Sequence, residues 1–418
     1  AARGRARMAA PGRRGAAVPA AAATAAATQP SAGPVLSEWR EDTLTNEELA
    51  QTISMSKVRG IELELDALAA RIAPTQDYKS ACQRCLLSFR GQVAASPSAR
   101  QVLRPQQHVE LGGSHAQGTE IDGAEFDIIV RVAPRMPQAE REALLRSIRE
   151  TIEGAHSRTM MVSDSMRGYH SQGWSPMSVS FTEFPLRMVG HVLVLERAAE
   201  QGADAPLTID SAIKRLCDCC QAARDVIRLV KLWATNHGLS SQQDGHLSSI
   251  AWALLVIFFL QSERHLIPSL SSLLQGGPVP RPAEPPQLLA LLRDFFVFFT
   301  SRGKHPMLGF SVFHAQEFQS PSGGLFVEDP AALKSLGQRR SLTEQVGQAQ
   351  WARAQDEARK VADKLTAKPQ RWFHWAEIFD PRELPPEKIQ KIQPLRDTLE
   401  DLGVAGVAAM PCGAAVAA

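Results

Sequence analysis

The chain has 418 residues, 44% of them hydrophobic, which is enough for two or three soluble domains of ordinary size. Its 46 Lys and Arg balance 44 Asp and Glu, and a formal net charge of +2 excludes a global field that draws the protein to nucleic acid or anionic lipid. The longest apolar run, residues 250–260, is shorter than the roughly 20 residues that a membrane span requires, so we expect no membrane association.

Residues 1–44 are rich in Ala, Arg and Pro, and no acidic residue precedes Glu38. This composition predicts a disordered segment, although an acid-free, Arg-bearing start is also typical of an organelle transit peptide. The first residue is Ala rather than Met, so we expect a fragment or a processed chain. Six cysteines without the spacing of a disulfide framework favour a reducing compartment. The cytoplasm is therefore the favoured location, with an organelle left open.

The first half of the chain, residues 45–205, predicts a compact α/β unit. Helical spacing of apolar residues extends over "NEELAQTISMSKVRGIELELDALAARIAP" until Pro74 stops it, and again over "YKSACQRCLLSFRGQVAAS". Five short apolar runs then predict strands: "HVELGG", "FDIIVRV", "TMMVS", "MSVSFTEF" and "GHVLVLE". One helical piece, "PQAEREALLRSIRETIEG", interrupts them, as is typical of strands around a crossing helix.

The second half, residues 206–370, predicts an all-α domain. Its expected helices are residues 209–237, 247–262, 287–300 and 341–365. Residues 371–418 predict a last short helix over 385–402 and a low-complexity tail. The fold class is thus α/β plus all-α, and we expect a ligand cleft between the two halves.

Two carboxylates follow a small-residue loop in "GGSHAQGTEIDGAEFDIIV". Because side chains alternate along a strand, Glu125 and Asp127 share a face while Phe126 points to the core. Two acids on one face repel each other unless a cation lies between them, and Mg²⁺ prefers carboxylates together with phosphate oxygens. Gly113 and Ser114 offer backbone N–H groups and a hydroxyl to an anion. The pattern indicates a loop for a nucleotide's phosphates beside a metal site.

These residues resemble the nucleotidyltransferase signature, in which Gly-Ser, three residues, Gly, five residues and a small residue precede acid-x-acid. Further on, "RLVKLWATNHGL", "GHLSSIAWALLVIFFLQ", "LLALLRDFFVFF" and "FVEDPAAL" resemble the helical core and associated domain of terminal nucleotidyltransferases of the poly(A) and poly(U) polymerase group. The resemblance spans roughly residues 46–365. It implies a nucleotidyltransferase palm, with a mixed sheet and helices, and a helical poly(A)-polymerase-associated domain.

The resemblance implies a role for each matching residue. Glu125 and Asp127 become the metal ligands and catalytic acids for Mg²⁺ or Mn²⁺. The residues expected to bind the nucleotide are Gly113, Ser114, Lys231, Ser248, Ser249 and Asp329. Glu328, beside Asp329, is a further candidate for orienting the base. Taken alone, Lys231 would be a snorkelling lysine, Ser248 a helix N-cap and Asp329 a turn residue.

Several positions depart from the family's pattern. The third carboxylate is expected on the strand "GHVLVLER", where His191 stands in its aligned position. Glu196 at the end of that strand is our preferred substitute, ahead of Glu183 on the preceding strand. Thr235 stands where the family has a second phosphate-binding lysine. Ile250 stands where the family has the aromatic residue that stacks on the base. Ile209 stands where the family has an asparagine at the start of the long helix, and Asp210 follows it.

The resemblance implies a template-independent RNA nucleotidyltransferase that adds AMP or UMP from ATP or UTP to RNA 3′ ends by a two-metal mechanism. No RNA-binding module is recognisable, so we expect the choice of RNA to depend on a protein partner or on an N-terminal segment that this sequence lacks. The alternative is a catalytically degraded relative that acts as an RNA-binding or scaffold protein. A third hypothesis is a nucleotidyltransferase that makes a small nucleotide second messenger.

Overall fold

The computed structural model describes residues 46–154, 160–164, 177–183, 186–196, 207–302, 308–367, 373 and 375–379. The predicted disordered segment 1–44 and the predicted helix 385–402 with its tail lie outside these residues. The chain divides into two compact units, residues 1–49 and 50–418. Of the first unit only residues 46–49, the first turn of α1, are described.

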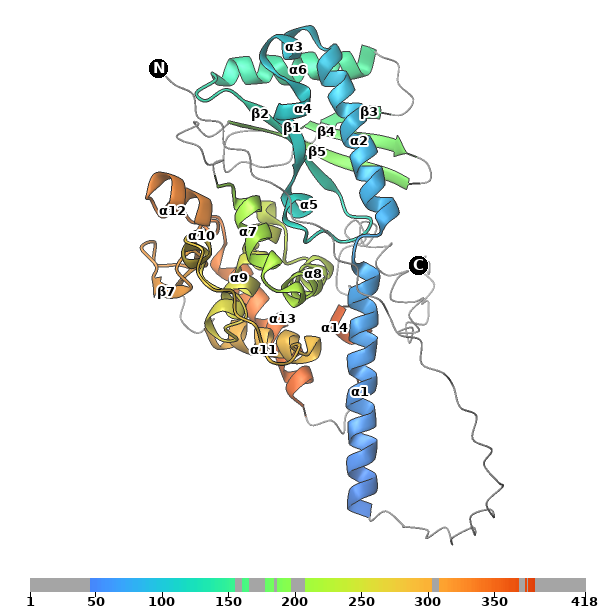
Figure 1. Ribbon diagram of the computed structural model, residues 1–418, viewed down its shortest axis with the longest axis vertical. Coiled ribbons are helices and arrows are strands. Elements are labelled where there is room, and N and C mark those ends of the chain that lie inside the picture. Colours follow the sequence, from blue (N-terminus) through green and yellow to red (C-terminus); the bar gives the residue numbers. More distant parts are fainter. Residues whose placement is uncertain are drawn as a thin grey trace, which may run out of the picture. The chain divides into compact units, whose positions relative to one another are not determined.

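Helices form most of the described chain (Figure 1). The helices that precede or lie among the strands of the first sheet are α1 (Asn46–Ile72), α2 (Gln76–Ala95), α3 (Pro97–Val102), α4 (Pro105–His108), α5 (Gly113–Gln117) and α6 (Gln138–Gly154). The later helices are α7 (Ile209–Asp218), α8 (Gln221–Asn236), η2 (Gln242–Asp244), α9 (Ser249–Ser262), α10 (Leu270–Leu274), α11 (Leu288–Arg302), α12 (Pro330–Leu336), α13 (Gln348–Thr366) and α14 (Ala376–Phe379).

The five predicted strands form one mixed sheet in the order β1-β2-β5-β4-β3. The strands are β1 (Val109–Gly112), β2 (Phe126–Val132), β3 (Met160–Asp164), β4 (Met177–Glu183) and β5 (Leu186–Glu196). β2 pairs in parallel with β5, and the other three pairings are antiparallel. The mixed α/β fold predicted for this half is therefore confirmed.

One face of this sheet is covered by α2 and α6. Residues 126, 128, 130 and 132 of β2 are buried with Phe89 of α2 and Ile148 of α6 in a single hydrophobic core. Because strand side chains alternate, the odd-numbered residues of β2 lie on the opposite face. The sheet thus separates its apolar core from the face that carries Asp127.

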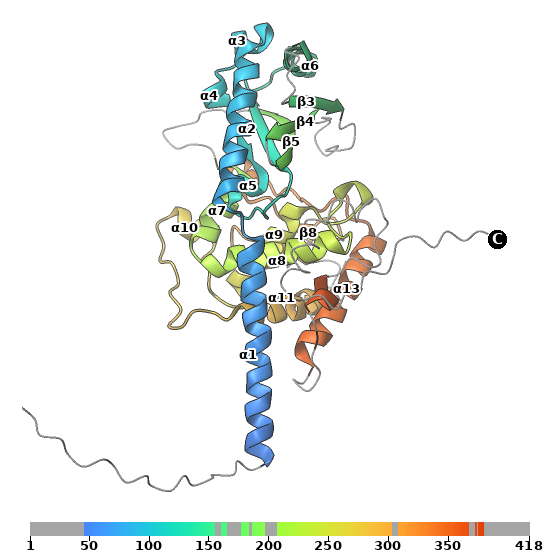
Figure 2. The ribbon, with the colours of Figure 1, turned by 90° about the vertical axis from the view of Figure 1, so that its right-hand side faces the viewer.

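The helical half has a second hydrophobic core, in which α8, α9 and α11 pack against one another (Figure 2). The second half of α1 adds Leu65 and Leu68 to this core. The Trp375 indole Nε1–H donates a hydrogen bond of 3.1 Å to the Ile61 carbonyl oxygen and so ties the end of the described chain to α1. α9 consists almost wholly of buried apolar residues, as expected for a core helix.

Three details differ from the sequence predictions. The single helix expected over residues 209–237 is two helices, because the chain leaves helical geometry at Cys220, whose φ of −148° lies in the extended region. The helix expected from residue 341 begins at Gln348. The stretch before it, expected to be loops, contains a small sheet of order β7-β6-β8. Its strands are β6 (Leu308–Ser311), β7 (Gln316–Gln319) and β8 (Phe326–Val327), too short to show an alternating pattern.

None of the described helices combines the length and the apolar character that a bilayer span requires.

Neighbouring residues of α2 test the core beneath the sheet. Phe89 is fully buried, whereas Leu87 is 60% exposed. We expect Phe89→Ala to lower the free energy of unfolding by about 3–5 kcal/mol, because it leaves a cavity, and Leu87→Ala to change it by less than about 0.5 kcal/mol. Urea denaturation of both variants measures the difference, and equal losses would contradict this packing.

Candidate functional site

Glu125 and Asp127 lie where β2 begins. The strand starts at Phe126, so Glu125 immediately precedes it and is exposed, while Asp127 is its second residue and is partly buried. Phe126 and Ile128 enter the core on the other face. The two carboxylates therefore lie on the face away from α2 and α6, as the alternation of the sequence predicts.

His191 of β5 lies beside Asp127 in the parallel register of β2 and β5. Its Nε2–H donates to the Glu125 Oε2 at 2.8 Å. Burial raises the pKa of Asp127 to about 6, with the negative charges of Asp210 and Glu125 adding to the effect and His191 and Lys231 opposing it. Burial is thus the main reason why the ionised form of Asp127 is disfavoured.

Glu196 is not brought together with these residues. It pairs in register with Val132, at the far end of β2, and forms an ion pair with Arg141 of α6. Glu196 is five positions beyond His191, which is roughly 16 Å along a strand. The side chain next to the acid pair on β5 is thus the imidazole of His191, and Glu196 does not enter our proposal. Glu183 ends β4, and its side chain lies outside the described part of the chain.

The Gly113 turn lies directly against Asp127. Gly113 has a φ of 56°, in the left-handed region, and a Cβ atom at this position would overlap the Asp127 carboxylate. Only glycine tolerates both conditions. The Gly113 N–H donates to Asp210 Oδ2 at 2.9 Å, so this donor is directed at α7. Ser114 follows in α5 and is partly buried.

Lys231 reaches the same loop from α8. It is 5% exposed, and its Nζ donates to Thr119 Oγ1 at 2.7 Å. Burial lowers the pKa of Lys231 from its ordinary 10.5 to about 8. Glu120 and Asp210 oppose that shift. The lysine that the sequence alone reads as snorkelling is instead buried beside the loop and the acids.

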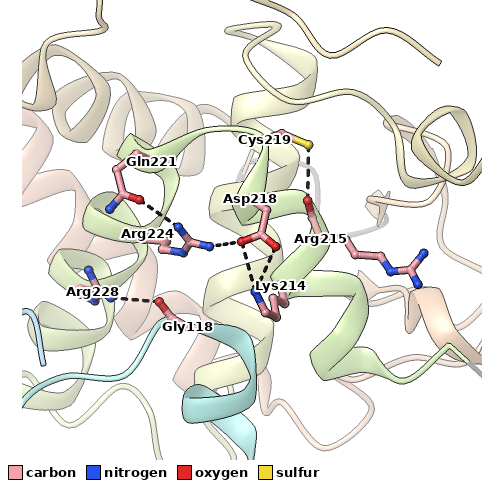
Figure 3. Close-up of polar contacts among 8 residues, drawn as sticks. All are labelled: Gly118, Lys214, Arg215, Asp218, Cys219, Gln221, Arg224 and Arg228. Carbon is pink, nitrogen blue, oxygen red and sulfur yellow. Dashed lines mark hydrogen bonds and ion pairs between the residues drawn. The ribbon is translucent and has the colours of Figure 1, made fainter. Parts of the chain in front are cut away.

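Arg228, which precedes Lys231 by about one turn of α8, holds the other side of the loop (Figure 3). Its Nη2 donates to the Gly118 carbonyl oxygen and its Nε to the Glu120 carbonyl oxygen, both at 3.0 Å. Beside it, Arg224 forms an ion pair with Asp218, which also binds Lys214 (Figure 3). Arg228 thus fixes the backbone of the loop that leads into β2.

The serines of "LSS", predicted to bind nucleotide, lie at the N-terminus of α9, where serine is a common helix cap. Ser248 is the N-cap of α9, and its Oγ accepts from the Ala251 N–H at 3.1 Å. Ser249 is the first residue of the helix and is exposed. Ile250 packs against the helical core, and Thr235 is exposed with its Oγ1 3.3 Å from Ser240 Oγ. Nucleotide contacts of Ser248 and Ser249 stay predictions.

Asp329 is likewise a cap. Its Oδ1 accepts from the N–H groups of Ala331 and Ala332, at 2.9 and 3.2 Å, at the start of α12. Glu328 is buried, accepts a hydrogen bond from Ser311 and pairs with Arg339 at 3.2 Å. Since α12 packs against α7, Asp329 belongs to a helix next to the one that carries Asp210. Its contact with a nucleotide stays a prediction.

Asp210, Gln117 and Thr119 are site residues that sequence reasoning misses. All three are buried, at 9%, 1% and 0% exposure. The sequence places Asp210 only beside an expected asparagine. One signal could have found it: residues 210, 213 and 217 share the buried face of α7, and an acid on an apolar stripe needs a partner.

A divalent cation fits the donor set only together with a further ligand. Glu125 and Asp127 offer carboxylate oxygens, and a bound cation would offset the burial and the neighbouring acids that raise the pKa of Asp127. His191 offers nitrogen, which Mg²⁺ disfavours. Among the residues that the structure describes, no three His, Cys, Asp or Glu side chains form a group able to hold a metal alone. The set suits a cation that brings phosphate oxygens with it.

The expected cleft between the two halves stays a prediction. A hollow lined by Arg353, Asp356, Lys360 and other residues of α13 includes none of the site residues. Because one helix alone lines it, it has no opposing wall to enclose a ligand.

Solved structures share this fold. Cid1 poly(U) polymerase, solved as a point mutant bound to MgATP, has 13% sequence identity over 77% of this chain and 98% of its own, with a TM-score of 0.58. A cytoplasmic RNA terminal U-transferase has 12% identity over 79% and 99%, at 0.58. mtPAP in complex with UTP has 15% identity over 79% and 72%, at 0.59. No protein-family model and no curated protein matches the sequence. The chain therefore has the fold of poly(A) and poly(U) polymerases.

The depressed pKa of Lys231 predicts a pH-dependent stability. Below pH 8 the lysine is charged in both the folded and the unfolded state, and its burial costs free energy. Between about 8 and 10.5 the unfolded chain binds more protons, so stability rises with pH in that window. Lys231→Met removes the titrating group and with it this pH-dependent contribution to stability. We expect the free energy of unfolding of wild type minus that of Lys231→Met to increase from pH 7.5 to about 10.

Urea denaturation at several pH values measures this difference, which cancels the titration of groups common to both proteins. Lys214→Met is a matched control, because Lys214 is 53% exposed. A difference that is flat with pH for Lys231→Met, or equally steep for both variants, would contradict the buried state of Lys231.

Proposed function

We propose that this protein is an RNA 3′-terminal nucleotidyltransferase that transfers AMP or UMP from ATP or UTP. The 3′-hydroxyl oxygen of the RNA attacks the α-phosphorus, the bond to the bridging oxygen breaks, and pyrophosphate leaves. Proteins with the same fold have been solved with UTP, with MgATP and with the short product ApU, which supports both substrates.

One observation carries this proposal: the partly buried Asp127 carboxylate lies beside Glu125 and against the Gly113 turn, and within the field of Lys231. A nucleoside triphosphate with a divalent cation has the charge distribution that complements this arrangement. The cation matches Glu125 and Asp127, and the phosphates match Lys231. Mg²⁺ or Mn²⁺, when bound, supplies neutralisation of the triphosphate and polarisation of the α-phosphate.

The chain's own residues then have distinct roles. Lys231 uses one N–H on Thr119 and keeps two for phosphate oxygens. The N–H of Gly113 is directed at Asp210, so the contacts of the turn with phosphate fall to Ser114. His191 holds the Glu125 carboxylate by its hydrogen bond. Catalysis in such a site rests on positioning and on charge neutralisation rather than on a covalent intermediate.

A second candidate function is an RNA-binding or scaffold protein without catalysis. The observation that favours it is His191, which stands beside Asp127 where the resemblance implies a third carboxylate, and which binds the first acid. Two carboxylates and one imidazole support one divalent cation better than the two of the predicted two-metal mechanism.

An RNA extension assay separates the two functions. Labelled RNA is incubated with Mg²⁺ or Mn²⁺ and each nucleoside triphosphate separately. We expect extension with ATP or UTP, a loss of at least about a hundredfold in Asp127→Asn because the cation loses a ligand, and no product in EDTA. Asp356→Asn, an exposed carboxylate of α13, is the control expected to keep full activity.

RNA binding without extension under every metal and nucleotide would support the scaffold instead. Product formed equally well without RNA would support the synthesis of a small nucleotide messenger. Full activity of Asp127→Asn would contradict the proposed site.

The imidazole at position 191 gives a separate prediction. His191→Asp adds an oxygen ligand beside Asp127, so we expect the Mg²⁺ concentration for half-maximal stabilisation by nucleotide to fall on the order of tenfold. Thermal denaturation with a fixed concentration of UTP and increasing Mg²⁺ measures this midpoint. His191→Asn, which removes the imidazole without adding a charge, is the matched control. An unchanged or higher midpoint in His191→Asp would contradict the placement of the cation.

A further inference from the structure

A continuous chain of buried hydrogen bonds joins Lys231 to Asp210. Lys231 Nζ donates to Thr119 Oγ1 at 2.7 Å, and Thr119 Oγ1 donates to Gln117 Oε1 at 3.1 Å. Gln117 Nε2 then donates to Asp210 Oδ1 at 2.8 Å. The other carboxylate oxygen, Oδ2, accepts from the Gly113 N–H at 2.9 Å. Every member is buried, apart from the partly buried Gly113.

All side-chain links in this chain point the same way. Each donor lies on the Lys231 side and each acceptor on the Asp210 side, so the cation and the anion polarise the groups between them in a common direction. Chains of this kind strengthen their own hydrogen bonds in a low dielectric. A buried lysine and a buried aspartate, each costly alone, thereby compensate each other without direct contact.

The same chain connects three parts of the fold that the proposed reaction needs in register. Gly113 and Gln117 are the two ends of α5, Asp210 is in the first turn of α7, and Lys231 is in the middle of α8. α5 packs against α7, which places the turn between the acid pair and the helices. A shift of any one of these elements breaks at least one link.

We propose that Asp210 and Gln117, acting through Thr119, are positioning residues that hold the Gly113 turn and the Lys231 ammonium in register to receive a triphosphate. This inference rests on the proposed function, because it assumes that the turn and the lysine bind phosphate. Neither residue contacts the nucleotide in this account. They act through the turn and through Lys231.

A reversal of the polarity of one link tests the proposal. Asp210→Asn places an amide against the Gln117 amide, and Gln117→Glu places a second carboxylate against Asp210, so each single change disrupts the link. In the double variant Asp210→Asn with Gln117→Glu, the new Asn can donate to the new Glu and still accept from Gly113, and the Glu can still accept from Thr119. The double variant therefore restores every link and keeps the net charge.

We expect each single variant to raise KM for ATP or UTP about tenfold or more with KM for RNA unchanged, and the double variant to return within about threefold of wild type. The dissociation constant of a fluorescent nucleoside triphosphate with Mg²⁺, measured without RNA, should change in parallel. Thr119→Val cuts the links of Thr119 to both Lys231 and Gln117 and leaves the two links of Asp210 in place. It should therefore weaken nucleotide binding in the same direction even if the Asp210 variants fold poorly. Asp218→Asn, an exposed carboxylate at the other end of α7, is the control.

The outcomes separate this inference from the proposed function. Extension by the wild type, with unchanged KM and nucleotide affinity in all these variants, would overturn the positioning role and leave the proposed function intact. Lower melting temperatures with a lower kcat and unchanged nucleotide affinity would show a merely structural role and also overturn it. A wild-type protein that neither binds nor transfers a nucleotide would remove both.

Discussion

The compensation of two buried opposite charges, Lys231 and Asp210, is the constraint on which the rest of the site depends. Neither charge has the other as a direct partner, and the polar groups of Thr119 and Gln117 carry the interaction between them. Because an uncompensated buried charge is strongly unfavourable, the loop that provides those groups must stay between α7 and α8. That loop also leads into β2, where Glu125 and Asp127 lie. The position of the acid pair relative to the lysine thus follows from the internal polar chain.

The parallel register of β2 and β5 is the second constraint on the chemistry. It sets His191 beside Asp127 and Glu196 at the opposite end of the strand pair. At this end of the strand pair the site consequently has two carboxylates and one imidazole that binds Glu125, while the buried Lys231 and Asp210 belong to the helices beside it. This set differs from three carboxylates, and it supports a site that acquires its cation together with a nucleotide. The chain shares its fold with Cid1 poly(U) polymerase, solved with MgATP, and with mtPAP, solved with UTP.

Local patterns in the sequence predict the elements well, and tertiary contacts explain what they miss. The five strands and the acid-x-acid face are visible because strand alternation is a local property. The partners of Asp210 are 93 and 97 residues away in sequence, at Gln117 and Gly113, so no local pattern reveals them. Sequence reasoning prefers Glu196 because residue type alone cannot show the strand register. The capping roles of Ser248 and Asp329 agree with the ordinary behaviour of these residues, and a role in nucleotide binding would be additional.

The most direct test of the central claim is a crystal structure with Mn²⁺ and a non-hydrolysable UTP analogue, in which anomalous scattering locates the metal. The account predicts a peak within roughly 2.0–2.3 Å of oxygen atoms from both Glu125 and Asp127, with phosphate oxygens completing the coordination and Lys231 near the triphosphate. A bound nucleotide with its metal elsewhere, or a peak that only one of these carboxylates contacts, would contradict it.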